Sequence, residues 1–359
     1  MRSRVRTGMA KGAFPFRYLG GPITASRISE RDCDVLVDKL TKQITSWTTK
    51  NLSYAGRAKL INTVLYGIIS FWSRIFLIPN KVMKKIMALC RNYLWSSSPE
   101  YKKCPLINWE EVCLPKQEGG LGLKNLLKWN QASIMRLIWD IASKKDTLWV
   151  KWIHTKYLKG ATVWEYSPKQ DDCYYWKKML QNRKLFQGMT TMTSYDSKIG
   201  YDWLIGMHTR VDWRDLVWNK WSIPKHKFIA WLIWKGIILT KDRLSRFMDI
   251  DTKCVLCEEE VESADHLFCT CSFVVSVHKA LRPWLKHDLV STSLTELKEK
   301  MWKGKNRKDR LWIASSIVSC CYYVWKARNS KLHNKREETS AKVAEEVKTV
   351  LAMAVNRRD

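Results

Sequence analysis

The sequence predicts a mainly α-helical protein that carries one small module built on cysteine and histidine. Apolar residues recur every three or four positions through several long segments, which is the spacing of helices that bury one face. Strict alternation of apolar and polar residues, the pattern of half-buried strands, is scarce. With 359 residues, of which 46% are hydrophobic, the chain is long enough for two or three domains and can bury their cores.

Three helices are expected near the start of the chain. The first begins after Ser29, which forms a capping-box pattern with Asp32, and its apolar face comprises Leu36, Leu40, Ile44 and Trp47. The second begins at Ser53 and keeps apolar residues at helical spacing until Pro79 ends it. Asn80 is suited to cap a third helix. Helix therefore follows helix in this part of the chain.

The middle of the chain is less regular. Residues 96–122 are rich in turn-forming residues and include Gly119-Gly120-Leu121-Gly122, which predicts a turn and not a phosphate-binding loop, because no strand precedes it. A helix follows over Leu126–Ile141, so a domain boundary is expected near residue 125. Residues 145–210 show little periodicity, and Met189–Gly200 is expected to be a loop, with a strand as the alternative.

Helical patterns return in the last part of the chain. Trp213–Leu244 predicts two helical pieces around Ser222-Ile223-Pro224, and a long helix is expected from about Asp309 to Arg336. The longest apolar runs are Phe228–Leu239 and Leu311–Trp325. Both are shorter than the roughly 20 residues that a membrane span needs. We therefore expect buried helices and no membrane partner.

Cys254, Cys257, His266 and Cys271 form a C-x2-C-x8-H-x4-C pattern, which is the spacing of a metal site. Three thiolates and one imidazole match the four-coordinate preference of zinc and leave no open position for water or substrate, so a Zn2+ ion held there has a structural role. An iron–sulfur cluster usually requires four thiolates. Two alternatives stay open. Cys269 is a second choice for the last ligand, or these residues are separate core cysteines and a surface histidine.

The charge of the chain indicates the class of its partner. Lysine and arginine number 63 against 34 acidic residues, a net charge of +29, which favours a polyanion and, above all, nucleic acid. The eleven cysteines are an odd number, and no secretory signal precedes Pro15. We therefore expect a reducing, intracellular compartment, either the nucleus or the cytoplasm.

Several short blocks, taken together, resemble one family. They are Phe16-Arg17-Tyr18-Leu19-Gly20, Leu52-Ser53-Tyr54-Ala55-Gly56-Arg57, Val112-Cys113-Leu114-Pro115-Lys116, Pro224-Lys225, the Cys254 and Cys257 pair, His266-Leu267-Phe268 with Cys271, and Trp325-Lys326-Ala327-Arg328-Asn329. With these blocks the chain resembles the C-terminal part of plant LINE-type (non-LTR) retroelement reverse transcriptases, including their reverse-transcriptase zinc-binding domain.

The resemblance implies a helical thumb-like region followed by a helical region with a small CCHC zinc-binding module. The implied domains are 1–100, the end of the palm and the thumb-like helices; 101–150, a linker and helix; 151–290, the zinc-binding domain; and 291–359, a basic helical C-terminal region. Val255 stands where the family commonly has proline, Glu258 where glycine is frequent, and His278 near a usual tryptophan. These departures keep the ligands and suggest a drifting, inactive copy of the element.

The resemblance also bears on catalysis. In this family an aromatic-x-Asp-Asp turn holds the two catalytic Mg2+ ions, and the sequence lacks that turn. Asp171-Asp172 is the only adjacent pair of aspartates, and we expect it to cap a helix or to face solvent. Other catalytic patterns, such as G-x-S-x-G and H-E-x-x-H, are also absent from the sequence. We therefore expect a non-catalytic fragment.

Candidate contacts with nucleic acid lie in Met301–Arg336, in the thumb-like helices and at Lys225 on the flank of the metal module. Met301–Arg336 contains ten lysines or arginines and one acid, interleaved with aromatic residues, which suits phosphate contacts and base stacking. The alternative is that the aromatic residues form core and the cations only solvate the outer face. The thumb-like helices offer a second surface. The candidate residues are Arg57, Lys59, Lys84, Lys85, Lys225, Arg307, Lys308 and Arg310.

A competing hypothesis is a zinc-stapled protein–protein interaction module. Between Cys254 and Cys271 there is no lysine or arginine, so this loop is expected to repel phosphate. Its five acids are Glu258, Glu259, Glu260, Glu262 and Asp265. In this hypothesis the acidic loop and exposed tryptophans contact another protein, and the basic charge of the chain is incidental.

Overall fold

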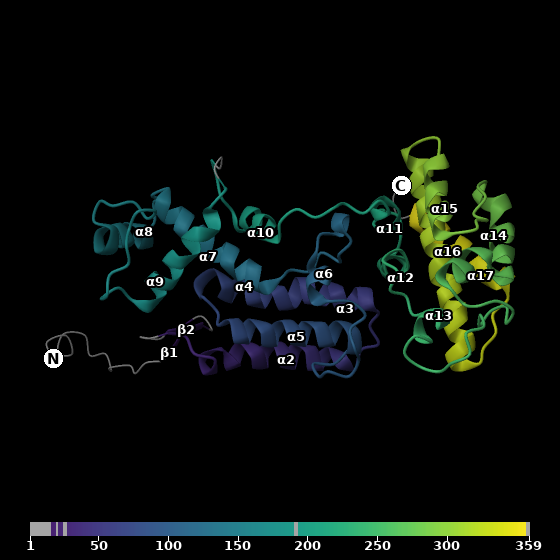
Figure 1. The fold of residues 1–359 in the computed structure, drawn as a ribbon, viewed down its shortest axis with the longest axis horizontal. Coiled ribbons are helices and arrows are strands. Elements are labelled where there is room, and N and C mark those ends of the chain that lie inside the picture. The colour runs from purple at the N-terminus through teal and green to yellow at the C-terminus, as the bar shows by residue number, and fades with distance from the viewer. Residues whose placement is uncertain (1–15, 19–20, 24–26, 190–192, 357–359) are drawn as a thin grey trace. The chain divides into compact units, whose positions relative to one another are not determined.

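The structure is a computed structural model that describes residues 16–18, 21–23, 27–189 and 193–356. The chain forms two compact units (Figure 1). The N-terminal unit comprises residues 1–51, 57–105 and 123–208, and the C-terminal unit comprises residues 52–56, 106–122 and 209–359.

The prediction of a mainly helical fold is confirmed (Figure 1). In the described residues the strands are β1 (Phe16–Tyr18) and β2 (Gly21–Ile23), which pair antiparallel with Phe16 opposite Ile23. One isolated bridge joins Lys253 and Val261. Among the helices in the described part of the chain, none is both long enough and apolar enough to cross a membrane.

The helices expected near the start of the chain are present. A short turn, η1 (Arg31–Cys33), leads into α2 (Asp34–Thr48). Ser29 and Asp32 form the expected capping box, because the N–H of Ser29 donates to the Asp32 carboxylate (2.7 Å) and the N–H of Asp32 donates to the Ser29 hydroxyl (3.3 Å). The next helical run consists of α3 (Tyr54–Leu60), η2 (Ile61–Leu65) and α4 (Tyr66–Ile75), and α5 (Asn80–Ser96) follows the proline.

A buried asparagine holds the turn between α4 and α5. Asn130 lies on α7 (Leu126–Ala142) and is 6% exposed. Its amide Nδ2 donates to the carbonyls of Ser73 (3.1 Å) and Phe76 (2.8 Å), and its Oδ1 accepts the N–H of Ile78 (3.2 Å). These bonds satisfy backbone groups that water does not reach. A single side chain therefore fixes the path of the chain from one helix to the next.

Residues 145–210, expected to be irregular, contain short helices, the first four of which share a common core. They are α8 (Leu148–Ile153), η4 (His154–Leu158), α9 (Tyr174–Gln181), η5 (Asn182–Phe186) and α10 (Ser197–Ile205). Ile134 and Ile138 of α7 pack with Val150, Trp176 and Met179 in one buried cluster. Each short helix buries only a few side chains, which is too few to reveal a period in the sequence.

The expected loop Met189–Gly200 is shorter in the structure, because α10 already begins at Ser197 with Asp196 as its cap. Residues 190–192 lie outside the described residues, and the remaining residues of this segment form no strand.

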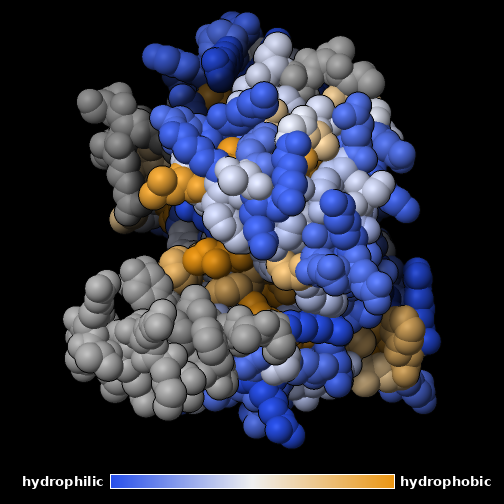
Figure 2. All heavy atoms as spheres, turned by 90° about the vertical axis from the view of Figure 1, so that its left-hand side faces the viewer, coloured by the Kyte–Doolittle hydropathy of each residue, from blue (hydrophilic) through white to orange (hydrophobic). Residues whose placement is uncertain are grey.

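The N-terminal unit has an open cleft of about 1000 Å³ between the α4–α5 turn, α7 and α9. Its lining is mixed and includes apolar Ile75 and Leu77 together with Lys81, Lys178 and Lys184. The face drawn in Figure 2 has the same mixed character, because hydrophobic residues are exposed in a hollow within a mostly hydrophilic surface.

The helix α16 (Arg307–Asn334) is the central element of the C-terminal unit (Figure 1). Every residue from Ile313 to Cys321 is buried, so the helix is covered on all sides, as expected for a helix that is apolar around its circumference. Its neighbours are α12 (Pro224–Trp234), α14 (Ser272–Leu285) and α17 (Ser340–Asn356). The prediction that Leu311–Trp325 is a buried helix is confirmed.

Shorter elements complete the C-terminal unit. They are α6 (Trp109–Cys113), η3 (Lys116–Glu118), α11 (Arg214–Val217), α13 (Lys241–Leu244), η6 (His266–Thr270), α15 (Leu294–Glu299) and η7 (Lys300–Lys303). The glycine run folds as the predicted turn. A Cβ atom on Gly120 would lie 2.0 Å from the carbonyl oxygen of Leu114, so this close approach requires glycine.

Candidate metal centre

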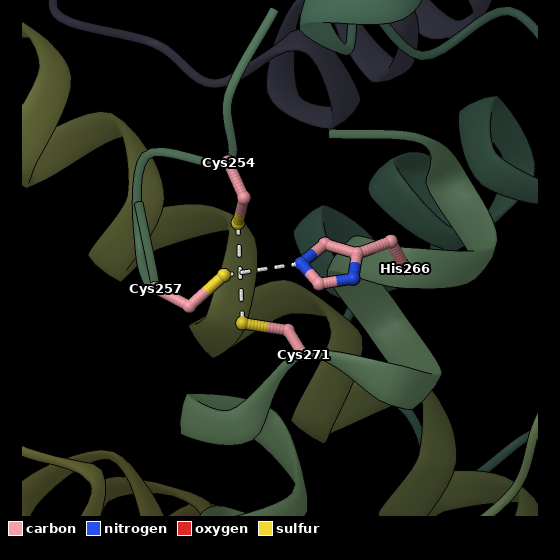
Figure 3. Close-up of side chains that lie close together, drawn as sticks. All are labelled: Cys254, Cys257, His266 and Cys271. Carbon is pink, nitrogen blue, oxygen red and sulfur yellow. Dashed lines mark hydrogen bonds between the residues drawn. The ribbon is translucent and has the colours of Figure 1, made fainter. Parts of the chain in front are cut away.

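The four residues with metal-ligand spacing converge in the C-terminal unit (Figure 3). One donor atom from each of Cys254, Cys257, His266 and Cys271 lies within 4.8 Å of all the others. The sulfur atoms of Cys254 and Cys271 are 3.9 Å apart, and the Cys257 sulfur is 3.3 Å from Nε2 of His266. In a tetrahedral zinc site the sulfur atoms lie about 3.8 Å apart, and sulfur and nitrogen about 3.5 Å apart. The donor set and its spacing therefore fit zinc.

Three local structures position these donors. Cys254 and Cys257 lie on a tight hairpin, in which the N–H of Cys254 donates to Glu260 O (2.7 Å) and the N–H of Glu258 donates to Cys254 O (2.8 Å). His266 is the first residue of η6, and Cys271 is the cap residue at the start of α14. A hairpin and the start of a helix thus face each other across the cluster.

The backbone around Cys254 and Cys271 is arranged to favour thiolates. The pKa of Cys254 is lowered to about 5, first because the Cys271 thiol donates to it and then because the N–H groups of Cys257 and Leu256 point at it, against the effect of burial. The pKa of Cys271 is raised by its role as the donor in this pair and by burial. Its sulfur also accepts the N–H groups of Phe273 and Val274. A metal ion would replace the proton that the two sulfurs share.

A carboxylate sets the tautomer of the histidine. Oε2 of Glu260 lies 2.9 Å from Nδ1 of His266, and the Thr270 hydroxyl lies 3.3 Å from the same nitrogen. A proton on Nδ1 that is donated to Glu260 leaves the lone pair of Nε2 facing the three sulfurs. This is the second-shell arrangement that zinc-bound histidines usually have.

Cys269 does not belong to the cluster. It is fully buried, and burial raises the pKa of its thiol to about 12. Among the described residues the cluster contains Cys271 as its fourth member, so the structure favours the H-x4-C spacing over the H-x2-C alternative.

Glu262 ties the metal hairpin to the central helix. The side chains of Glu262 and Arg328 are both buried, and the guanidinium donates to the carboxylate through Nη2 (2.7 Å) and Nε (3.3 Å). The same carboxylate accepts the backbone N–H groups of Lys241 (3.0 Å) and Val255 (3.2 Å). It thereby joins the start of α13, the hairpin and α16. Sequence patterns do not reveal this pair, because the two residues are 66 positions apart.

The expected acidic surface of this loop is smaller than the sequence suggests. Glu262 is buried against Arg328 and Glu260 faces His266. Glu258 pairs with Lys331 (2.7 Å), and Asp265 accepts the N–H of Leu294 (2.7 Å). Four of the five acids therefore have partners within the unit, and only Glu259 of this set has none in the described residues. The expectation that this loop repels phosphate stays a prediction.

Glu258 adopts a left-handed backbone conformation, with φ at +62°. This explains why glycine is frequent at this position in the family that the chain resembles, since a side chain there costs about 1–2 kcal/mol.

We expect Glu258→Gly to be more stable than Glu258→Gln by about 1 kcal/mol, measured from the urea midpoints of the two variants. Both lose the Lys331 ion pair, so the comparison isolates the backbone. A glycine variant less stable than the glutamine variant would contradict this explanation.

The candidate nucleic-acid contacts lie in both units. Arg57 is a correction, because it is buried at 7% exposure and its guanidinium donates to the carbonyl of Tyr93 (3.4 Å), so it does not present its charge to solvent. The others are exposed: Lys59, Lys84 and Lys85 in the N-terminal unit, and Lys225, Arg307, Lys308 and Arg310 in the C-terminal unit.

The ten cations of Met301–Arg336 are not equivalent. Lys326 pairs with Glu346 (2.6 Å), Arg328 with Glu262 and Lys331 with Glu258, so these three are neutralised within the unit. In the described residues no carboxylate pairs with the five exposed cations that precede the buried part of α16. These are Lys303, Lys305, Arg307, Lys308 and Arg310. We call these five the free basic segment of the C-terminal unit. Lys335 and Arg336, at the other end of α16, are also exposed and have no carboxylate partner in the described residues.

The adjacent aspartates form part of a turn. The Asp172 carboxylate accepts the hydroxyl of Tyr166 (3.0 Å) and the N–H of Lys169 (2.8 Å), and α9 begins two residues later. This is a local role in the backbone. The absence of polymerase activity stays a prediction.

Known proteins show similarity to this chain. The family described as zinc-binding in reverse transcriptase matches residues 195–277, which include all four cluster residues. A provisionally named ribonuclease H protein of Arabidopsis thaliana is 32% identical over 39% of this chain, an alignment that spans 22% of that protein. An uncharacterized mitochondrial protein of the same plant is 26% identical over 39% of the chain and 85% of its own length. With the cluster, these matches indicate a reverse-transcriptase-related chain and suggest zinc.

Proposed function

We propose that this chain is the non-catalytic C-terminal part of a plant LINE-type retroelement reverse transcriptase, in which a structural zinc ion orders a region that binds nucleic acid. The observation that carries this proposal is the Cys3His cluster within the segment that matches the reverse-transcriptase zinc-binding family. The two relatives from Arabidopsis support a plant origin.

In this proposal Cys254, Cys257, His266 and Cys271 hold one Zn2+ ion. With four protein ligands the ion has no open position, so it supplies cross-linking and not catalysis. It would fasten the hairpin to the start of α14, while the Glu262–Arg328 pair fastens the same hairpin to α16. The role of the metal is therefore to keep the C-terminal unit folded in an intracellular, reducing environment, where its thiolates remain available.

The free basic segment supports nucleic acid as the partner. Its five exposed cations have no acidic partner in the described part of the unit, so phosphates would compensate their charge. Lys59, Lys84 and Lys85 offer a further exposed group on the N-terminal unit. Contacts of this kind bind the backbone of a strand without reading its sequence.

Salt dependence tests this function. We expect RNA affinity, measured by fluorescence anisotropy, to fall steeply between about 50 and about 200 mM salt. Arg307→Ser/Lys308→Ser should reduce the magnitude of the slope by about 1.5 to 2, because two phosphate contacts are lost. Lys335→Ser/Arg336→Ser removes the same charge at the opposite end of the same helix and should leave the slope unchanged. An affinity that hardly responds to salt would overturn the proposal.

A second candidate function, a protein-interaction module, has one specific observation in its favour. The N-terminal unit exposes Leu148 (88%), Trp152 (52%) and Trp164 (44%). Tryptophan is among the residue types enriched at protein–protein interfaces. The acidic loop no longer supports this candidate, because most of its carboxylates are engaged within the C-terminal unit. A full-length protein that binds neither RNA nor DNA at low salt would favour this candidate.

A further inference from the structure

Trp302 is an exposed aromatic side chain within the free basic segment. It lies on η7 and is 50% exposed, although its neighbour Met301 is buried. The Arg310 guanidinium lies over its ring, 5.4 Å from the centroid. The positive charge is attracted to the electron-rich face of the indole. The side chain is therefore held at the surface by a contact that leaves half of it open.

The backbone beneath Trp302 is fixed on both sides. Lys300 is buried, and its ammonium donates to the carbonyl of Val290. On the other side Gly304 approaches α16 so closely that a Cβ atom would lie 2.7 Å from the N atom of Arg310. The Arg310 Nε also donates to Gly304 O (3.3 Å). The ring is thus presented by a segment that does not need to be ordered when a ligand binds, which lowers the entropic cost of binding.

The acid within this segment, Asp309, is engaged by hydrogen bonds. Asp309 accepts the N–H of Lys305 (2.9 Å) and its other oxygen lies 2.9 Å from Nε2 of His287. The hydrogen bond from Lys305 and the neighbouring His287 lower the pKa of this carboxyl. Its charge is thus compensated by Lys305 N–H and His287. Trp302 and the five cations are exposed, and Glu299 is the nearest exposed acid before them in the chain.

We infer that Trp302 and Arg310 form a stacking platform for one unpaired base, and that the free basic segment binds single-stranded nucleic acid in preference to a duplex, an inference that rests on the nucleic-acid binding proposed above. An indole stacks on a base only when that base is not already stacked between its neighbours in a helix. The cations hold the phosphates on either side of the splayed base. Stacking needs no particular base, so the platform tolerates any sequence.

The test compares single strands and duplexes with matched variants of the full-length protein loaded with zinc. The ligands are unstructured strands of about 16 nucleotides and duplexes of the same length, each as RNA and as DNA. Trp302→Ala should weaken single-strand binding about tenfold and leave duplex binding within about twofold. Trp302→Phe, which keeps an aromatic face, should recover most of the loss. Neither variant removes a charge, so the salt slope should not change.

Trp152→Ala is the control. Trp152 has a similar exposure, 52%, and lies in the N-terminal unit with no cation over its ring in the described residues, so its removal should leave the affinity for single strands unchanged.

The results separate failure of the stacking platform from failure of the proposed function. Equal losses of single-strand and duplex affinity in Trp302→Ala, or no loss in either, would overturn the platform even if Arg307→Ser/Lys308→Ser lowers the salt slope and so upholds phosphate binding. A wild-type protein that binds none of the four ligands would overturn the proposed function itself. A difference between the RNA and DNA strands would identify which of the two the platform receives.

Discussion

Cys257→Ser is expected to abolish stoichiometric zinc binding and to unfold the hairpin and the start of α14. Zinc-finger peptides gain about 10–16 kcal/mol of apparent binding free energy from their metal, which exceeds the stability of many whole domains. Cys257 lies 3.3 Å from His266 Nε2 within the cluster, so its loss leaves three donors around the ion. Elemental analysis should show less than one zinc per chain, and hydrogen exchange should show lost protection across residues 254–285.

Cys269→Ser is the matched control for this experiment. It replaces a nearby thiol that is fully buried but lies outside the cluster, so the variant should retain one zinc per chain. Treatment of the wild type with a chelator should reproduce the exchange pattern of Cys257→Ser. Full zinc content in Cys257→Ser, together with a wild type that keeps its protection after chelation, would contradict the structural role of the metal.

Arg328→Met is expected to destabilise the C-terminal unit by about 3–5 kcal/mol, because it leaves the buried carboxylate of Glu262 without its counter-ion. In Glu262→Gln/Arg328→Met the buried charge is removed as well, so this double variant should be more stable than Arg328→Met. Urea unfolding followed by circular dichroism measures both differences.

Lys331→Met provides the comparison on the same helix. It breaks the ion pairs with Glu258 and Glu337, whose side chains are 69% and 75% exposed, and each pair of this kind contributes at most about 1 kcal/mol. If Arg328→Met costs no more than Lys331→Met, the buried pair does not hold the hairpin on α16.

The parts of the structure that the sequence predicts are those encoded by neighbouring residues. The capping box of Ser29 and Asp32, the end of the helical run before Pro79 and the buried helix around Val318 each follow from patterns within a few turns of helix. The spacing of the four candidate ligands is also local, since they lie within 18 residues of one another. Their convergence in space could therefore be predicted before any tertiary contact was known.

The parts that the sequence does not predict depend on distant partners. In the sequence Arg57 looks like a surface cation, because its contact with Tyr93 is not visible there. Glu262 likewise looks like one of several acids in a polar loop, because its contact with Arg328 is not visible. No sequence pattern indicates the role of Asn130, because its partners are three backbone groups at the end of α4 and in the turn after it. The short helices of residues 145–210 are not evident in the sequence for a related reason. Each contributes only a few apolar residues to a core that several of them share.

The metal hairpin and the free basic segment are attached to α16 at different points along its length. At a rise of about 1.5 Å per residue, Arg328 and Arg310 are separated by about 27 Å of rigid rod. An ion in the cluster would act on the basic end of the helix through the elements between them, which are α16 itself and α15, whose first residue donates its N–H to Asp265. Cobalt substituted for zinc should accordingly give an absorption spectrum that reports the integrity of the fold and stays silent when a strand binds.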